Sequence, residues 1–179
     1  MEKLVVIDGN FWLFSCYYAT AAMGNLMVNK DGIPTNAVYG FANRLESLLK
    51  QDPEYLVVAF DAKGKTFRSE LLEEYKGTRK PMPQELHEQV PVMKEVLTAM
   101  GVPILTKAGY EADDILGTIA KRCAAEGVEV SIVSGDRDLL QLADTHIKIR
   151  MPRTSKGTTE IRDYYPEDVK AEYQAVSYT

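Results

Sequence analysis

Cysteine and histidine are both scarce in this sequence, with two of each among 179 residues. Cys16 and Cys123 lie in apolar stretches without a nearby histidine, so we expect neither a disulfide framework nor a thiolate metal site. No apolar run approaches the roughly 20 residues that span a bilayer, and no basic N-terminal segment precedes a long apolar one. We therefore expect a cytoplasmic protein without a membrane partner.

Internal repeats and low-complexity segments are also missing, and basic residues are outnumbered by acidic ones. The net charge of −5 would by itself argue against a nucleic-acid partner. That conclusion changes if several acids hold divalent cations, because bound cations reverse the local sign of charge where a substrate would lie. The composition, 45% hydrophobic and 26% charged, is otherwise that of one ordinary globular domain.

Short apolar and β-branched runs alternate with stretches of helical periodicity. We predict strands at residues 3–7, 55–60, 102–105, 128–133 and 147–149, and a hairpin turn at 154–159. Helices are predicted at residues 11–22, 36–49, 84–100 and 110–125, and from residue 166 onward. Such alternation predicts an α/β fold, with helices on both faces of a mostly parallel sheet.

Acidic residues follow three of the predicted strands, and three more lie at one helix start, in the stretch Tyr110-Glu-Ala-Asp-Asp-Ile115. Right-handed crossovers bring the carboxyl ends of parallel strands to one edge, where ligands bind in α/β sheets. We therefore expect seven carboxylates in one cleft: Asp8, Asp61, Glu111, Asp113, Asp114, Asp136 and Asp138. The alternative is that each acid merely caps a loop or helix, a role that suits Asp8 equally well.

The chemistry of this set favours a hard divalent cation. Oxygen ligands without histidine or cysteine select Mg²⁺ or Mn²⁺ over zinc. Without a cation, so many neighbouring carboxylates would not all stay ionised. Seven acids exceed the needs of one ion, and paired ions are a common device for phosphodiester hydrolysis.

The stretch at residues 62–83 is basic and poor in apolar residues. Its cations are Lys63, Lys65, Arg68, Lys76, Arg79 and Lys80. One interpretation is a solvated surface loop. The other is a mobile, partly helical element that contacts phosphates, because Tyr75 beside these cations suits single-stranded nucleic acid, whose bases stack on aromatic rings.

Five motifs together resemble the 5′-nuclease domain of bacterial DNA polymerase I, in the flap endonuclease superfamily. They are Val6-Ile-Asp-Gly-Asn10, Ala59-Phe-Asp61, Phe67-Arg68 followed by Tyr75-Lys-Gly-Thr-Arg79-Lys-Pro-Met-Pro83, Tyr110-Glu-Ala-Asp-Asp-Ile115-Leu-Gly-Thr118, and Ser134-Gly-Asp-Arg-Asp138 with Gln141-Leu142. The resemblance runs from residue 3 to about residue 173. It implies a three-layer α/β/α PIN-like, flap-endonuclease-like domain over residues 1–179, with a mobile basic arch at about 62–83.

The resemblance also implies an activity and its residues. The expected activity is that of a metal-dependent 5′→3′ exonuclease and structure-specific flap endonuclease, which acts in bacterial replication and repair. The expected partner is DNA with a 5′ flap or single-stranded 5′ end, or an RNA primer in a hybrid. The resemblance assigns Tyr75, Lys76 and Arg79 to steering and catalysis and Arg68 to a phosphate contact, with Lys63, Lys65 and Lys80 as further binding residues. The seven acids would bind one or two Mg²⁺ or Mn²⁺ ions.

Two departures from the family pattern change these expectations. Phe11 and Ser15 stand where the family has serine and arginine. The sequence also lacks the later acidic motif and the helix–hairpin–helix of the family. One metal ion is therefore a safer expectation than two. It would lie nearest Asp8, Asp61, Glu111 and Asp113. The alternatives are a weakly active or inactive nucleic-acid-binding fragment and a PIN-type ribonuclease.

Overall fold

The computed structural model describes residues 3–21, 24, 27–71, 81–155 and 158–174. Its six-stranded sheet has the order β3-β2-β1-β4-β5-β6. The strands are β1 (Lys3–Asp8), β2 (Tyr55–Ala59), β3 (Ile104–Leu105), β4 (Glu129–Val133), β5 (Ile147–Ser155) and β6 (Thr158–Tyr164). All neighbouring strands pair in parallel except β5 and β6. The predicted mostly parallel sheet is therefore confirmed.

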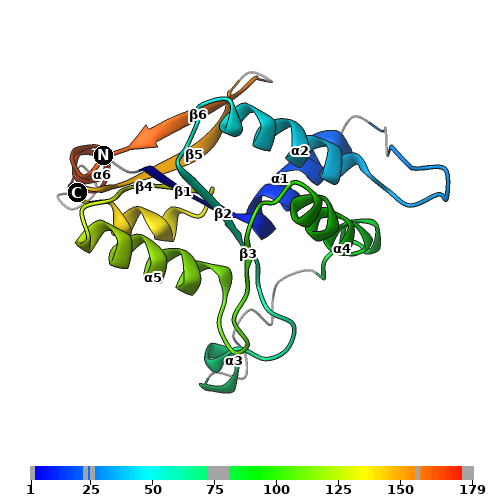
Figure 1. The fold of residues 1–179 in the computed structure, drawn as a ribbon, viewed down its shortest axis with the longest axis horizontal. Coiled ribbons are helices and arrows are strands. Elements are labelled where there is room, and N and C mark those ends of the chain that lie inside the picture. The colour runs from blue at the N-terminus through cyan, green and yellow to red at the C-terminus, as the bar shows by residue number, and fades with distance from the viewer. Residues whose placement is uncertain (1–2, 22–23, 25–26, 72–80, 156–157, 175–179) are drawn as a thin grey trace.

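Helices cover both faces of this sheet, as Figure 1 shows. They are α1 (Gly9–Ala21), α2 (Asn36–Leu49), α3 (Phe67–Leu71), α4 (Gln84–Ala99), α5 (Ala112–Ala125) and α6 (Pro166–Gln174), with the 3₁₀-helix η1 (Arg137–Leu142). One face packs against α1, α2 and α4, and the other against α5 and η1. The fold is thus the three-layer α/β/α architecture predicted from the sequence. No helix of the described residues is long and apolar enough to cross a bilayer.

Strand β1 shows how the sequence produces the two apolar cores. Successive side chains of a strand point to opposite faces of the sheet. Val5 and Ile7 enter the core beneath α1, α2 and α4, while Leu4 and Val6 enter the core beneath α5. Because both faces are buried, the strand is apolar from Leu4 to Ile7, between the exposed Lys3 at its start and Asp8 at its end.

Several element boundaries differ from the sequence predictions. Helix α1 starts two residues earlier than predicted, directly after Asp8, and α5 starts at Ala112 because Glu111 is its N-cap. Strand β3 is shortened to two residues. Strand β5 is longer than the predicted 147–149, because it continues into an antiparallel pairing with β6 in which Ser155 lies opposite Thr158. This pairing confirms the predicted hairpin, whose turn residues 156–157 lie outside the described residues.

Candidate active site

Asp8 is the most enclosed of the predicted acids. It ends β1, an inner strand, and only 5% of its surface is exposed. Its carboxylate accepts the Phe11 N–H at 2.9 Å and the Ser134 hydroxyl at 2.8 Å. Burial raises the pKa of Asp8, the two hydrogen bonds offset this only in part, and the charges of Asp61 and Asp136 raise the pKa further. Asp8 is therefore a buried acid with two other acids nearby.

The turn after β4 carries the next two acids, and Ser134 organises it. The Ser134 side chain is fully buried, and its hydroxyl accepts the Asp136 N–H at 3.1 Å while donating to Asp8. Asp136 in turn accepts the Asp138 N–H at 2.9 Å and so caps η1. Asp136 is half-buried and Asp138 is exposed. One hydroxyl thus connects the carboxyl ends of β1 and β4.

Asp61, two residues after β2, is bonded to the start of α5. Its Oδ1 accepts the Ala112 N–H at 2.7 Å. The first N–H groups of a helix have no intrahelical partner, and the helix dipole favours negative charge there. Glu111, which is buried, precedes this helix, and its own N–H donates to Asp114 Oδ2 at 3.0 Å. The helix start therefore stabilises several carboxylates beside the sheet edge.

Arg68 on α3 is a cation that lies among these acids. Its Nη1 and Nη2 atoms each donate to an oxygen of Asp114 at 2.7 Å, and Nη1 lies 3.5 Å from Glu111 Oε2. A two-pronged guanidinium–carboxylate pair is among the strongest side-chain interactions. Arg68 therefore neutralises part of the acid cluster at the start of α5. Its predicted contact with a substrate phosphate stays a prediction.

The seven acids gather at one edge but do not all meet. The charges of Asp61 and Asp136 both raise the pKa of Asp8, while Asp114 forms an ion pair with Arg68. Asp113 is half-buried on the first turn of α5. Within the residues that the structure describes, no three acidic, histidine or cysteine side chains are arranged to hold a metal ion. The seven-ligand site stays a prediction.

The other residues predicted to contact nucleic acid, apart from Arg68, divide into two groups. Lys63 and Lys65 are exposed in the loop between β2 and α3, so both are accessible to solvent. Their contact with nucleic acid stays a prediction. The other four predictions, Tyr75, Lys76, Arg79 and Lys80, lie outside the described residues.

The chemistry of the edge nevertheless fits a hard divalent cation. The donors are all carboxylate oxygens, the kind that Mg²⁺ and Mn²⁺ prefer. The raised pKa of Asp8, caused by burial and by two neighbouring acids, marks a place where added positive charge would be favourable. Asp8, Asp61 and Asp136 are the carboxylates that such an ion would meet there.

The two family departures have structural consequences. The Phe11 ring lies against Gly135, where an added Cβ would be 1.9 Å from the ring, so the turn before Asp136 requires glycine. Arg44 on α2 donates from Nη1 to Ser15 Oγ at 3.1 Å. A guanidinium is therefore present at Ser15, although it comes from another helix.

Ser134 and the pairing of Arg68 with the acids were not predicted. A polar residue directly between a buried strand and Gly135 was the available signal for Ser134. For Arg68 the sequence carried no such signal, because its partners lie more than 40 residues away along the chain.

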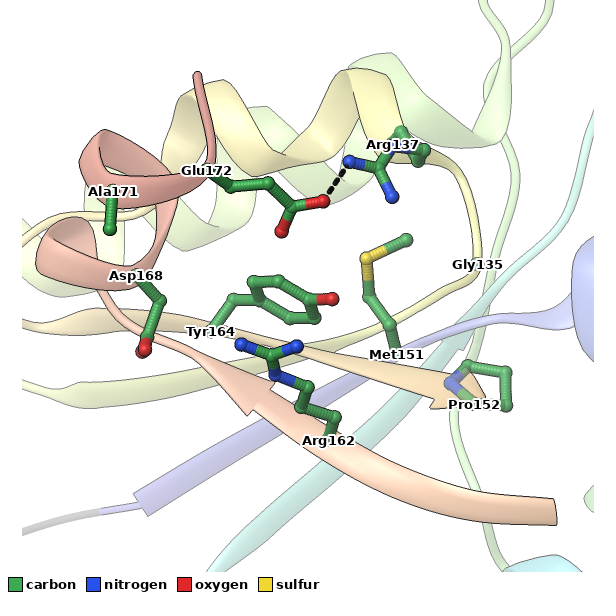
Figure 2. A pocket seen from close by; sticks show the side chains of 9 residues that line it. All are labelled: Gly135, Arg137, Met151, Pro152, Arg162, Tyr164, Asp168, Ala171 and Glu172. Carbon is green, nitrogen blue, oxygen red and sulfur yellow. Dashed lines mark hydrogen bonds and ion pairs between the residues drawn. The ribbon is translucent and has the colours of Figure 1, made fainter. Parts of the chain in front are cut away.

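A polar hollow of about 580 Å³ is lined by Gly135 and by residues of η1, β5, β6 and α6 (Figure 2). Arg137 lies at one side of this hollow and forms an ion pair with Glu172 of α6. Arg162 stacks over the Tyr164 ring, with its Cζ 4.6 Å from the ring centroid. The ion pair between Arg137 and Glu172 therefore connects the acid-bearing turn after β4 to α6.

A parallel sheet between two helical layers, with carboxylates at its carboxyl edge, places this chain among the PIN-like, flap-endonuclease-like proteins. Residues 3–174 match the family model of the 5′-3′ exonuclease, N-terminal resolvase-like domain. The chain belongs to this 5′-3′ exonuclease family.

Curated relatives support the same assignment. The chain is 46% identical over 173 residues to DNA polymerase I of Bacillus caldotenax, and 43% identical over 173 residues to DNA polymerase I of Bacillus subtilis strain 168. Each alignment covers 96% of this chain but only 19% of the relative. The chain thus corresponds to about a fifth of the length of these polymerases.

Solved structures agree with the fold. A bacteriophage T5 protein co-crystallised with metal ions has a TM-score of 0.66 and 25% identity, and the match covers 97% of this chain and 60% of that one. The T5 flap endonuclease in a complex with DNA and metal ions has a TM-score of 0.69 and 24% identity, over 97% and 61% of the two chains. Both share the α/β/α architecture.

Proposed function

We propose that this chain is a divalent-metal-dependent 5′-nuclease domain that hydrolyses DNA at a 5′ flap or single-stranded 5′ end. One observation carries the proposal: Asp8 is buried at the end of β1 and shares the Ser134 hydroxyl with the backbone of Asp136, and the charges of Asp61 and Asp136 both raise the pKa of Asp8. Family membership supports the choice of nuclease chemistry. The T5 relatives crystallised with metal ions and with DNA support the choice of cofactor and substrate.

The proposed ion is Mg²⁺ or Mn²⁺. Its proposed ligands are Asp8, Asp61 and Asp136, whose side chains would turn toward one another to hold it, with Glu111 and Asp113 as further ligands. A bound ion of this kind supplies a more acidic water and positive charge beside the scissile phosphate. The protein contributes the placement of the ligands. Ser134 fixes the Asp8 carboxylate, and the Ala112 N–H fixes Asp61.

The test is cleavage of a 5′-labelled flap substrate with titrated Mg²⁺ or Mn²⁺. We expect cleavage by the wild-type chain and a loss of at least about 100-fold in Asp8→Asn, the scale seen when a transition-state-stabilising group is removed. Asp31→Asn, in an exposed turn, is the matched control and should keep wild-type activity.

A stability measurement makes the same variant informative without turnover. Asp8→Asn removes a buried negative charge that the charges of two other acids disfavour. The thermal midpoint of this variant in EDTA should therefore equal or exceed that of the wild type. Mn²⁺ should raise the wild-type midpoint and leave the variant nearly unchanged. Absence of cleavage with either ion, at low salt and high protein concentration, would contradict the proposal.

The same assay decides between DNA and RNA. Matched flaps with a DNA or an RNA 5′ strand should be compared at equal concentration. Faster cleavage of the DNA flap supports the proposal, whereas cleavage of single-stranded RNA alone would identify a ribonuclease.

A further inference from the structure

An apolar hollow beside α5 exposes two aromatic side chains close to the acid edge. Its volume is about 580 Å³, and its lining includes Phe67, Leu105, Lys107, Tyr110, Ile115 and Ile119. Phe67 is 38% exposed and Tyr110 is 44% exposed. Their ring centroids are 5.6 Å apart with an interplanar angle of 52°. The hollow is therefore a wide, open cavity with aromatic faces at its wall.

Helix α3 carries Phe67 of this aromatic pair and belongs to neither core. None of its five residues is buried, and Leu71 is 77% exposed. The helix is nevertheless fixed in place, because the Phe67 N–H donates to the Gly109 carbonyl at 3.0 Å and Arg68 grips Asp114. Exposed apolar groups that are held in position, rather than packed inside, are typical of binding surfaces.

The charges around the hollow favour an anionic aromatic ligand, because Asp114 in its lining is paired with Arg68 and further cations lie nearby. The Arg68 Cζ lies 4.6 Å from the centroid of the Phe67 ring. Lys107 is exposed in the lining, and Lys63 and Lys65 are exposed in the loop that leads to α3. Aromatic faces that stack on bases, combined with cations that follow phosphates, are the features of single-stranded nucleic-acid sites.

The position of the hollow connects it to the acid edge. Tyr110 directly precedes Glu111, the N-cap of α5, and Asp114 contributes to both the hollow and the acid cluster. We propose that this hollow binds an unpaired nucleobase of the single strand whose phosphate lies at the acid edge, stacked on Tyr110 and in contact with Phe67. The inference rests on the proposed function, because that function supplies the single-stranded substrate.

The test uses a DNA hairpin with a 5′ single-stranded overhang that carries 2-aminopurine near the junction, in EDTA so that no cleavage occurs. Binding by the wild-type chain should quench the fluorescence through stacking. Tyr110→Leu should bind about ten-fold more weakly, the scale of one lost base–aromatic stack, and lose most of the quenching. Tyr110→Phe should keep both.

Tyr55→Leu is the matched control, because Tyr55 is 51% exposed and begins β2, at the opposite end of the strand from the acid edge. It should bind and quench like the wild type. Equal binding and quenching by Tyr110→Leu and the wild type would overturn the inference.

A second measurement covers the case in which Tyr110→Leu does not fold. An overhang with 5-iodouracil should photo-crosslink the wild-type chain at Tyr110 or Phe67, identified by peptide mass spectrometry. Crosslinks confined to other segments would overturn the base site. Cleavage with metal is measured separately from stacking. Cleavage without stacking would contradict the base site alone. Stacking without cleavage would contradict the nuclease proposal alone.

Discussion

Arg68 is the residue whose position was least predictable from the sequence. Its effect is local, because it acts on the acids at the start of α5. The sequence identified it as a cation in a basic stretch, but not as the counter-ion of Asp114 and Glu111. The acids themselves were predictable, because each follows an apolar strand or begins a helix. Their counter-ion was not, because its place depends on how α3 folds back onto α5.

Arg68→Gln should therefore destabilise the metal-free protein. We expect the free energy of unfolding in EDTA to fall by about 1–3 kcal/mol, the scale of losing hydrogen bonds to a charged group. Urea denaturation gives the value, and Mg²⁺ should recover more stability in the variant than in the wild type, because a cation replaces the guanidinium.

Arg122→Gln is the control, since Arg122 is exposed in the last turn of the same helix. A favourable charge there contributes less than about 1 kcal/mol. An unchanged unfolding free energy for Arg68→Gln in EDTA would contradict the counter-ion role.

At the scale of elements, the strands and main helices were predictable because their apolar periodicity is strong. The exceptions are β3, which is shorter than predicted, and β5, whose length depends on β6. A strand of this length is stabilised by its partner, and Asp163 on β6 supplies part of the pairing: it accepts a hydrogen bond from Lys148 Nζ at 2.8 Å and one from Arg150 Nε at 3.0 Å. Such cross-strand pairs are not visible in local sequence.

Asp163→Asn tests this pairing through its pH dependence. Burial alone would raise the pKa of Asp163, but the hydrogen bonds and charges of Lys148 and Arg150 outweigh it, so the folded-state pKa lies below the unfolded value of about 3.9. The ionised carboxylate therefore contributes stability that is fully present above the unfolded pKa and is lost as the pH falls through the folded pKa.

We expect Asp163→Asn to lower the unfolding free energy by about 1–3 kcal/mol at neutral pH. The difference from the wild type should shrink below about pH 4, where the carboxylate begins to take up a proton in the unfolded chain. Denaturant titrations at several pH values measure it. Glu160→Gln, on the exposed part of the same strand, should show a small difference at every pH, and a pH-independent loss in Asp163→Asn would contradict the ion-pair explanation.

At the scale of the whole molecule, the net charge of −5 affects how the proposed DNA binding should depend on ions. For a basic protein, divalent cations weaken DNA binding, because they compete for the phosphates. Here they should strengthen it, because they neutralise the carboxylate edge where the strand must lie.

Fluorescence anisotropy with a flap that carries a phosphorothioate at the cleavage position measures this effect. We expect at least about three-fold tighter binding with millimolar Mg²⁺ than with K⁺ at equal ionic strength, which corresponds to about 0.7 kcal/mol. Asp8→Asn should lose this gain. Weaker binding in Mg²⁺ would show that the acids do not govern substrate affinity.

The central position of β1 also determines when the acid edge forms during synthesis. Strand β1 pairs with β2 on one side and with β4, more than 120 residues later, on the other. The hydroxyl that fixes Asp8 and the turn that carries Asp136 both follow β4. A nascent chain on the ribosome therefore lacks a complete edge until most of this sequence has emerged. If the proposed function holds, a chain from which β4 and the turn after it are missing should be inactive, because it lacks both Asp136 and the Ser134 hydroxyl that fixes Asp8.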